Sequence, residues 1–410
     1  MGMDAVTRWW RQRCAWEQLA IILWAVVLAA VCGRGLLSPR LHTVYPIYAA
    51  AARHWLDGDD LYQLLDGYDC YRYSPLVAVA FVPFGPLPGA LGGVLWRLLN
   101  AGVYLAALAW WARVALPQPA SRRQRAVLCL LVLPLSIGSL NNAQSNALVI
   151  GLLLAAMAGT ATRRWTLAAL CVGLACFFKL YPVAVGLLLA AVYPRRFAPR
   201  LAAVLVVGLL LPFTLQRPAY VAGQYAAWAE HLVAYDHHSD QAAVWYSDVL
   251  LLLRVWLVPI SRQEYLFLQV AAGAALAVLC LAARRAGWPP RRLLPLLLGL
   301  GCCWMTAFGP ATESCTYILL APPLAAALLQ AWQQRQPAWA KALLVTAQVL
   351  LVLAQAISWF PPLKLLREAG ASPFAALLLL TCLTALAVRD LAQRGEEMHV
   401  TAEAVCVPRN

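Results

Sequence analysis

Long apolar runs separated by short arginine clusters most constrain how this chain can fold. Runs such as Leu19–Leu37, Gly89–Arg113 and Tyr265–Ala283 are close to the ~20 residues that a helix needs to cross a bilayer. Only 12% of the residues are charged and 62% are hydrophobic, whereas a soluble domain is roughly 25% charged and 45–50% apolar. Lipid solvates such apolar surfaces, and backbone polar groups in lipid must pair within helices. The sequence therefore predicts an all-α integral membrane protein.

The remaining apolar runs predict about twelve spans (11–13). Two stretches, Ser74–Phe84 and Trp245–Pro259, are too short to assign as spans and are interpreted as interfacial or re-entrant. The first run lacks an A-x-A cleavage site, so we interpret it as an uncleaved span and not a signal peptide. The other predicted spans, the shorter ones paired as two hairpins, are Ala126–Leu140, Ala143–Gly159, Trp165–Phe178, Tyr181–Tyr193, Phe197–Leu215, Leu293–Phe308, Ser314–Ala331, Ala342–Trp359 and Pro373–Ala387.

The arginine clusters predict the orientation. With twelve alternating spans, most of the 32 basic residues fall on the side of the N-terminus, and that side is cytoplasmic by the positive-inside rule. Both termini are then cytoplasmic, in the inner membrane of the cell. The positive charges are not interleaved with aromatic residues, so a nucleic-acid partner is not expected despite the net charge of +14. The clusters include Arg11/Arg13, Arg122/Arg123/Arg125, Arg163/Arg164, Arg195/Arg196/Arg200 and Arg284/Arg285/Arg291/Arg292.

The longer polar segments all fall on the opposite, exoplasmic face. We expect one transmembrane domain over residues 1–395, with exoplasmic loops at about 38–73 and 216–248, and a short, disordered cytoplasmic tail over 396–410. Function concentrates in loops more often than in scaffold. The pattern therefore predicts a single site on the exoplasmic face.

Lys179 is a candidate phosphate ligand. It stands between two short apolar runs, where an ammonium is costly and is a functional candidate by default. Pro182 begins the next run, so helix N-terminal amides point toward the same place, and an ammonium with a helix N-terminus favours a phosphate. The alternative is a lysine that extends its ammonium to the interface.

Uncharged polar residues fill the turn between the runs ending at Leu140 and beginning at Ala147. Asn142, Gln144 and Asn146 suit the hydroxyls of a sugar or a phosphate. Ordinary helix capping is the alternative, and it explains one or two such residues but not the whole group.

Two groups of carboxylates are candidates for a general base. Asp57, Asp59 and Asp60 surround Gly58 in the first exoplasmic loop, where aspartates are also common in solvated turns. Glu313 stands alone at the outer end of a late span with apolar runs on both sides. Such a position is harder to explain as a solvated loop.

Three further candidates are weaker. Arg72, with tyrosines on both sides, suits either an interfacial anchor or a second phosphate contact. His237 and His238 could contact a polar substrate or join a metal site, but adjacent histidines on a loop are weak evidence for a metal and a plain solvated loop is the simplest reading. No metal site or cofactor is expected.

Taken in order, several motifs resemble glycosyltransferase family 87, the polyprenyl-phosphate-mannose-dependent mannosyltransferases of the GT-C membrane fold. The resemblance extends over roughly residues 40–330. The matching pieces are Gly58-Asp59-Asp60-Leu61-Tyr62, Tyr73-Ser74-Pro75-Leu76, Gln144-Ser145-Asn146, Lys179-Leu180-Tyr181-Pro182 and Gly309-Pro310 with Tyr317 and Pro322-Pro323.

The resemblance implies a GT-C-like helical bundle with an exoplasmic site, a lipid-phosphate-linked sugar as donor, and inversion at the anomeric carbon. The stretch from Pro39 to Tyr45 lacks the Asp that family members usually carry there. The family's later His-containing segment is replaced by residues 311–317, which contain Glu313. Either Glu313 or one of the first-loop aspartates is then the base, or this branch has a different chemistry.

The leading hypothesis is transfer of a hexose such as mannose from a polyprenyl-phosphate donor to a glycan or glycolipid acceptor. Membrane lipid is the other expected partner. A transporter or flippase of a lipid-linked or polar solute is the alternative, and a structural subunit is a third reading. The predicted roles are catalysis by Glu313, Asp60, Asp59 or Asp57, phosphate binding by Lys179 and Arg72, and substrate binding by Asn142, Gln144, Asn146, Tyr181, His237 and His238.

Overall fold

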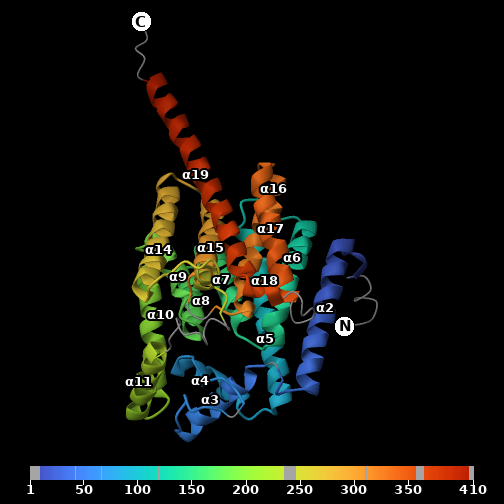
Figure 1. Ribbon diagram of the computed structural model, residues 1–410, viewed down its shortest axis with the longest axis vertical. Helices are drawn as coiled ribbons and strands as arrows, with labels where there is room; N and C mark the ends of the chain where they lie inside the picture. The colour runs from blue at the N-terminus through green and yellow to red at the C-terminus, as the bar shows by residue number, and fades with distance from the viewer. Residues whose placement is uncertain are drawn as a thin grey trace.

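The computed structural model describes residues 10–41, 43–65, 67–118, 120–234, 246–309, 312–356 and 364–405, with side chains up to residue 393. Helices make up all the regular structure in these ranges (Figure 1). They are α2 (Ala15–Leu37), α3 (Tyr45–Asp57), α4 (Pro75–Phe81), η1 (Val82–Phe84), α5 (Gly89–Val114), α6 (Arg122–Asn141), α7 (Asn146–Ala161), α8 (Trp165–Phe178), α9 (Val183–Val192), α10 (Ala198–Leu210), η2 (Leu211–Thr214), α11 (Pro218–Ala234), α13 (Val249–Val255), α14 (Arg262–Arg285), α15 (Pro290–Ala307), η3 (Ser314–Leu320), α16 (Ala321–Gln333), α17 (Ala338–Gln355), α18 (Lys364–Glu368) and α19 (Ala371–Val405).

Seven segments within the described residues are long and apolar enough to cross a membrane, and five shorter apolar helices accompany them. The seven are Ala15–Leu37, Gly89–Val114, Arg122–Asn141, Arg262–Arg285, Ser314–Gln333, Ala338–Gln355 and Ala371–Gln393. The prediction of a multi-pass helical membrane protein is confirmed. The number of twelve spans stays a prediction.

Exposed apolar side chains indicate which helices face lipid. On α14, the side chains of Phe267, Val270 and Val278 are more than half exposed, and the helix carries few charged residues. Water would make such a surface unfavourable, whereas lipid does not. The inner helix α7 differs from α14, since its side chains are buried on nearly every side. Gly151 lets α7 approach α5 closely, since a Cβ there would lie 3.0 Å from the Cα of Tyr104.

The arginine-rich turns lie together at one end of the bundle. The guanidinium of Arg284, at the end of α14, lies 5.3 Å from the ring of Tyr193, at the end of α9. Arg196, which follows α9, lies 5.7 Å from the ring of Trp165, at the start of α8. These contacts join three of the turns that the sequence places on one side of the membrane. The assignment of that side to the cytoplasm stays a prediction.

A second layer of short helices covers the other end. In Figure 1, α3, α4 and α11 form a group below the bundle, while α19 extends beyond its opposite end. These helices enclose a second hydrophobic core that includes Tyr48, Trp55, Phe81 and Trp96. The polar stretches expected as exoplasmic loops, about 38–73 and 216–248, thus contain the helices α3 and α11. The predicted tail boundary at residue 396 falls inside α19, which continues to Val405.

Candidate active site

The turn between α6 and α7 is the polar centre of the end covered by α3, α4 and α11. Ala143 within it has a φ of 52°, in the left-handed region that non-glycine residues rarely adopt. Its carbonyl accepts a hydrogen bond of 2.9 Å from Nε1 of Trp96, and Asn100 accepts one of 3.0 Å from the backbone N–H of Leu148. Helix α5 therefore holds both sides of the turn.

Arg97 is the third contact between α5 and this turn, and the sequence reasoning missed it. Its side chain is only 4% exposed. Nε donates to the carbonyl of Leu140 at 3.1 Å, and Nη2 donates to that of Asn141 at 2.8 Å. These carbonyls end α6, where a helix has unsatisfied acceptors and partial negative charge. A lone arginine within the apolar run Gly89–Arg113 was the available signal.

A directed chain of hydrogen bonds runs from the α8–α9 turn to Glu313. The hydroxyl of Tyr181 donates to Oδ1 of Asn146 at 3.1 Å, and Nδ2 of Asn146 donates to Oε1 of Gln144. Nε2 of Gln144 then donates to Oε2 of Glu313 at 2.6 Å. Every donor points toward the carboxylate, so one of its oxygens is fixed in position. The structure thus brings together four residues that the sequence analysis had selected independently.

Lys179 lies beside this chain, at the end of α8 and outside the helices. Its ammonium is 5.6 Å from the ring centre of Tyr181. Burial lowers the pKa of Lys179, the negative charge of Glu313 opposes this, and the positive charge of Arg72 adds to the lowering. Lys179, Glu313 and Arg72 are therefore close enough to interact electrostatically. We call these three residues the charged triad.

Arg72, in the loop before α4, is held by two partners from different parts of the chain. It donates to the hydroxyl of Tyr246 at 2.9 Å, and its Nη2 lies 2.8 Å from a carboxylate oxygen of Asp69. Burial by itself would lower the pKa of Arg72, but the bond to Tyr246 and the charge of Asp69 outweigh it, and the pKa is raised. The guanidinium therefore stays charged at any physiological pH.

Tyr48 and Tyr73 lie close to Glu313. The sequence analysis had not selected Tyr48. The hydroxyl of Tyr48 donates to that of Tyr73 at 2.7 Å, and the Tyr48 ring stacks on Phe81. Burial raises the pKa of Tyr73 well above its ordinary value, and the charge of Glu313 adds to the effect. The Tyr73 hydroxyl therefore remains protonated and, because it accepts from Tyr48, its own hydrogen can be donated to a polar ligand. The tyrosines around Arg72 had been read from the sequence as anchors or phosphate contacts only.

The first-loop aspartates lie elsewhere. Gly58, with a φ of 80°, ends α3, and Asp57, Asp59 and Asp60 around it are all exposed. Asp60 accepts from the backbone N–H of Tyr62, and the backbone carbonyl of Asp59 accepts from Tyr220 on α11. Among the contacts within the described residues, none joins these three carboxylates to the charged triad. Their proposed role as the base therefore receives no support from the geometry.

The remaining predicted residues have mixed outcomes. Asn142 lies beside the triad, with Nδ2 at 3.8 Å from Sγ of Cys315. His237 and His238 lie outside the described residues. Within the part of the chain that is described, no three histidine, cysteine or acidic side chains converge as a metal site.

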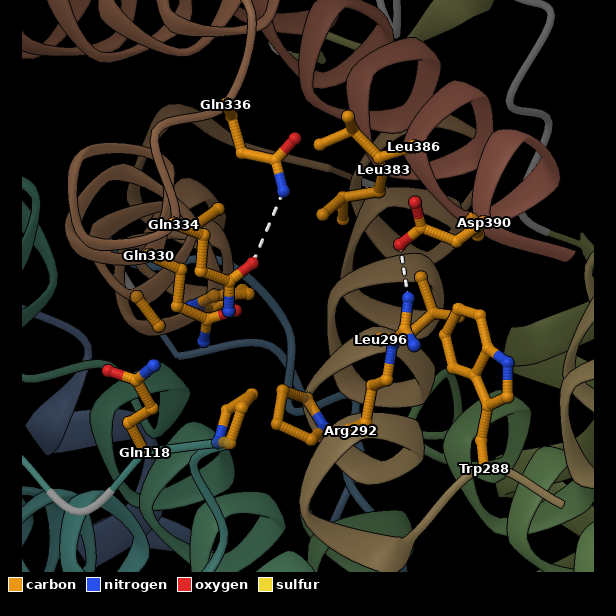
Figure 2. Close-up of a pocket in the computed structure, with 16 residues that line it drawn as sticks. Gln118, Trp288, Arg292, Leu296, Gln330, Gln334, Gln336, Leu383, Leu386 and Asp390 are labelled. Atoms are coloured by element: carbon orange, nitrogen blue, oxygen red, sulfur yellow. Dashed lines mark hydrogen bonds and ion pairs between the residues drawn. The ribbon is translucent and has the colours of Figure 1, made fainter. Parts of the chain in front are cut away.

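The cavity in Figure 2 does not coincide with the charged triad. It has a volume of about 430 Å³ and is lined by residues of α15, α16 and α19, including Arg292 and Asp390. Arg292 is near the start of α15, whereas Glu313 follows the end of that helix. The helix has 18 residues, so the two places are separated by roughly 27 Å along its axis.

The family model of glycosyltransferase family 87 matches residues 71–309, more than half of the chain. This chain belongs to glycosyltransferase family 87. The expected family is thereby confirmed, and with it the class of enzyme. The matched region contains Arg72, Gln144 and Lys179 and ends just before Glu313, while the first-loop aspartates precede it.

Solved structures add similarities at low identity. The crystal structure of ArnT from Cupriavidus metallidurans bound to undecaprenyl phosphate is 16% identical, with a TM-score of 0.42, over 90% of this chain and 77% of that chain. The apo form of the same protein is 15% identical, with a TM-score of 0.42, over 89% and 78%. No curated protein sequence matches the chain.

Proposed function

We propose that this membrane glycosyltransferase moves a hexose such as mannose from a polyprenyl-phosphate donor to a glycan or glycolipid acceptor on the exoplasmic face, with inversion. The observation that carries the proposal is that Lys179 lies beside the hydrogen-bonded chain that ends at Glu313, within electrostatic range of both Glu313 and Arg72 and outside the helices. The triad lies at the end of the bundle away from the arginine-rich turns. Family membership favours this enzyme over the transporter or flippase alternative.

The cations suit the donor phosphate. When the bond from the sugar to the phosphate breaks, the phosphate leaves with its electron pair and carries added negative charge. Fixed positive charge at that place stabilises the transition state more than the ground state. Lys179 and Arg72 can supply it, and the tie from Arg72 to Asp69 and Tyr246 keeps one of the cations in place before the donor binds.

Glu313 suits the acceptor. An acceptor hydroxyl that attacks the anomeric carbon must lose its proton, and a carboxylate within hydrogen-bond reach can take it. Attack from the face opposite the leaving phosphate inverts the anomeric centre. Gln144 occupies one oxygen of Glu313, so the other oxygen is the one that we assign to the acceptor. We assign the hydroxyl of Tyr73 to a sugar hydroxyl, with Tyr48 holding it in position. The chemistry proposed here uses no metal or cofactor.

Transfer from radiolabelled polyprenyl-phosphate mannose by the purified protein tests the proposal. We expect Glu313→Gln, which keeps the shape of the side chain, to lower kcat by about 10²–10⁴-fold, as the loss of a general base does. Asp60→Asn is the matched control, because Asp60 is exposed and outside the triad, and it should keep near-normal turnover. If Asp60→Asn lost turnover and Glu313→Gln kept it, the general base would instead be in the first loop. Absence of transfer from a panel of polyprenyl-phosphate sugars by the intact protein would refute the donor class.

A further inference from the structure

A cavity with a mixed polar and apolar lining at the arginine-rich end of the bundle is separate from the charged triad. It lies between α15, α16 and α19, and residues 117–118 before α6 close one side (Figure 2). Its volume of about 430 Å³ lies within the range of roughly 300–1,000 Å³ that is typical of small-ligand sites. Nothing in the proposed transfer reaction uses it.

The cavity is at the depth where helices leave the apolar layer. The spanning segment with α16 ends at Gln333, that with α19 ends at Gln393, and α15 begins at Pro290. Trp288 lines the cavity, and tryptophan is enriched at the boundary between lipid and water. The deeper lining is apolar and includes Leu296, Leu383 and Leu386. The site therefore joins a polar mouth to a lipid-like wall.

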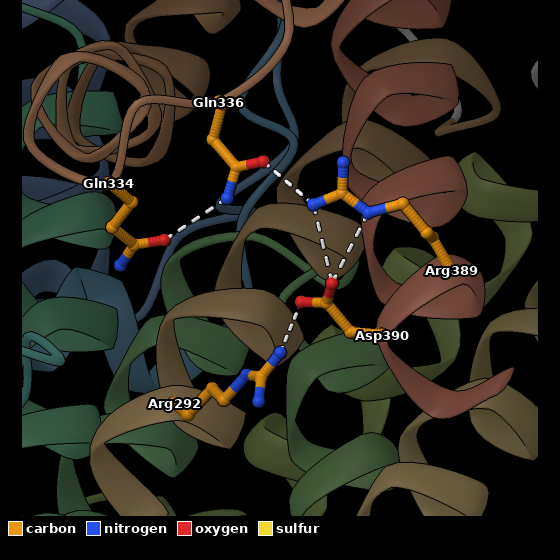
Figure 3. Close-up of polar contacts among 5 residues, drawn as sticks. All are labelled: Arg292, Gln334, Gln336, Arg389 and Asp390. Atoms are coloured by element: carbon orange, nitrogen blue, oxygen red, sulfur yellow. Dashed lines mark hydrogen bonds and ion pairs between the residues drawn. The ribbon is translucent and has the colours of Figure 1, made fainter. Parts of the chain in front are cut away.

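The charged group at the cavity has an excess of positive charge: Arg292 and Asp390 line the cavity, and Arg389 lies behind Asp390, outside the lining. Asp390 accepts from both Arg292 and Arg389, so two guanidinium groups share one carboxylate (Figure 3). The guanidinium of Arg292 also lies 3.8 Å from the ring centre of Trp288. Nη2 of Arg389 donates to Oε1 of Gln336 at 2.8 Å. One positive charge is left without a carboxylate within this group.

Glutamine amides provide the uncharged part of the lining. Figure 2 shows Gln118, Gln330 and Gln334 on one side of the cavity, facing Arg292 and Asp390 on the other. Gln334 accepts at 3.2 Å from Gln336 through Oε1. Within the described residues, the side chains of Gln118 and Gln330 and the Nε2 of Gln334 have no hydrogen-bond partner. These amides can pair with hydroxyl and phosphate oxygens of a ligand.

We propose that this cavity binds the glycerophosphate head group of an anionic phospholipid, of the phosphatidylglycerol type, from the adjoining leaflet. The phosphate is bound by the excess positive charge of the arginines, and the glycerol hydroxyls pair with the glutamine amides. The acyl chains leave along the leucine wall. The depth of the site favours a lipid over a soluble metabolite, and its charge favours an anionic lipid over a zwitterionic one.

Lipid binding to the full chain in detergent, followed by native mass spectrometry, tests this inference without any transfer reaction. We expect phosphatidylglycerol to be retained about tenfold better than phosphatidylcholine. The double variant Gln330→Leu/Gln334→Leu should lose about tenfold of that binding, because two amide contacts disappear. Gln333→Leu on the same turn of α16 is the matched control, since Gln333 does not line the cavity, and it should bind normally.

A second variant keeps the test decisive if the double variant is misfolded. Arg389→Gln removes the excess charge but leaves the Arg292–Asp390 ion pair, and it should abolish the preference for phosphatidylglycerol. The inference is overturned if both lipids bind equally to the natural protein, or if Gln333→Leu weakens binding as much as the double variant. Competition by soluble sn-glycerol 3-phosphate at similar concentration would identify a metabolite site instead of a lipid site.

Discussion

Arg97 offers the sharpest test of how the turn at residues 140–146 is held. Replacing it with methionine keeps an unbranched side chain as far as the position of Nε but removes the guanidinium and with it every donor. The carbonyls of Leu140 and Asn141 would lose their bonds of 3.1 and 2.8 Å. Both sit at the end of α6, and water reaches them poorly because Arg97 is only 4% exposed.

The magnitude follows from those two acceptors. A buried polar group left without a partner costs about 1–3 kcal/mol, so Arg97→Met should destabilise the protein by about 2–6 kcal/mol if neither carbonyl finds water. The loss of the buried guanidinium reduces this figure, because a buried charge is itself costly. We therefore expect Arg97→Met to destabilise the protein by an amount near the lower limit of this range. Arg97→Lys should destabilise it less, because a single ammonium can still reach one of the two carbonyls.

Thermal unfolding followed by the fluorescence of the 17 tryptophans measures this effect. Arg113→Met is the matched control, because Arg113 is in the same helix but is exposed, and such substitutions stay within about 0.5 kcal/mol. Turnover should fall as well in Arg97→Met, since Gln144 and Glu313 depend on the turn. The reasoning is refuted if Arg97→Met melts at or above the temperature of the natural protein with its activity intact.

Three further results are expected. Because the pKa of Lys179 is lowered by burial, raising the pH through that pKa removes the ammonium that binds the phosphate, so activity should fall on the alkaline side below pH 10.5. Lys179→Arg should shift this alkaline fall in activity to higher pH, and an unshifted fall would exclude Lys179 as its cause. Lys179→Ala should raise KM for the donor and lower kcat. Gln144→Leu should cut turnover by about tenfold, because it frees an oxygen of Glu313 and leaves Asn146 without its acceptor, while Gln333→Leu should not. In right-side-out vesicles of a Cys70→Ser background, which lacks the native cysteine of the same loop, an impermeant maleimide should react with Asp59→Cys and not with Arg195→Cys; labelling of both from outside would contradict the orientation.

Local sequence predicted most of the fold because each apolar run makes its own helix. The predicted run Trp165–Phe178 coincides with α8, and the predicted first run ends with α2 at Leu37 but begins four residues later than the helix. The helix α3 was missed as an element because its run of alanines lies in a stretch rich in charged and polar residues. It is stabilised by aromatic contacts with α4 and α5 that no local pattern reveals.

The candidate site was only partly predictable for a different reason. Lys179 and Glu313 were selected because a charge among apolar residues is costly wherever the fold places it. Arg97 obeys the same rule but was overlooked among the apolar residues of α5. Asp60 was selected from its motif, and the structure places it against α11.

The sequence by itself determined a helical membrane protein with arginine-rich turns at one end and polar segments at the other, because hydration and lipid solvation act on each segment separately. Tertiary structure alone decided that Gln144 meets Glu313 across 169 residues, and that Arg97 binds the end of α6. It also decided that the aspartates of the first loop are exposed, with no contact to either within the described residues. Such contacts depend on how helices pack against one another, and many packings satisfy the same apolar pattern.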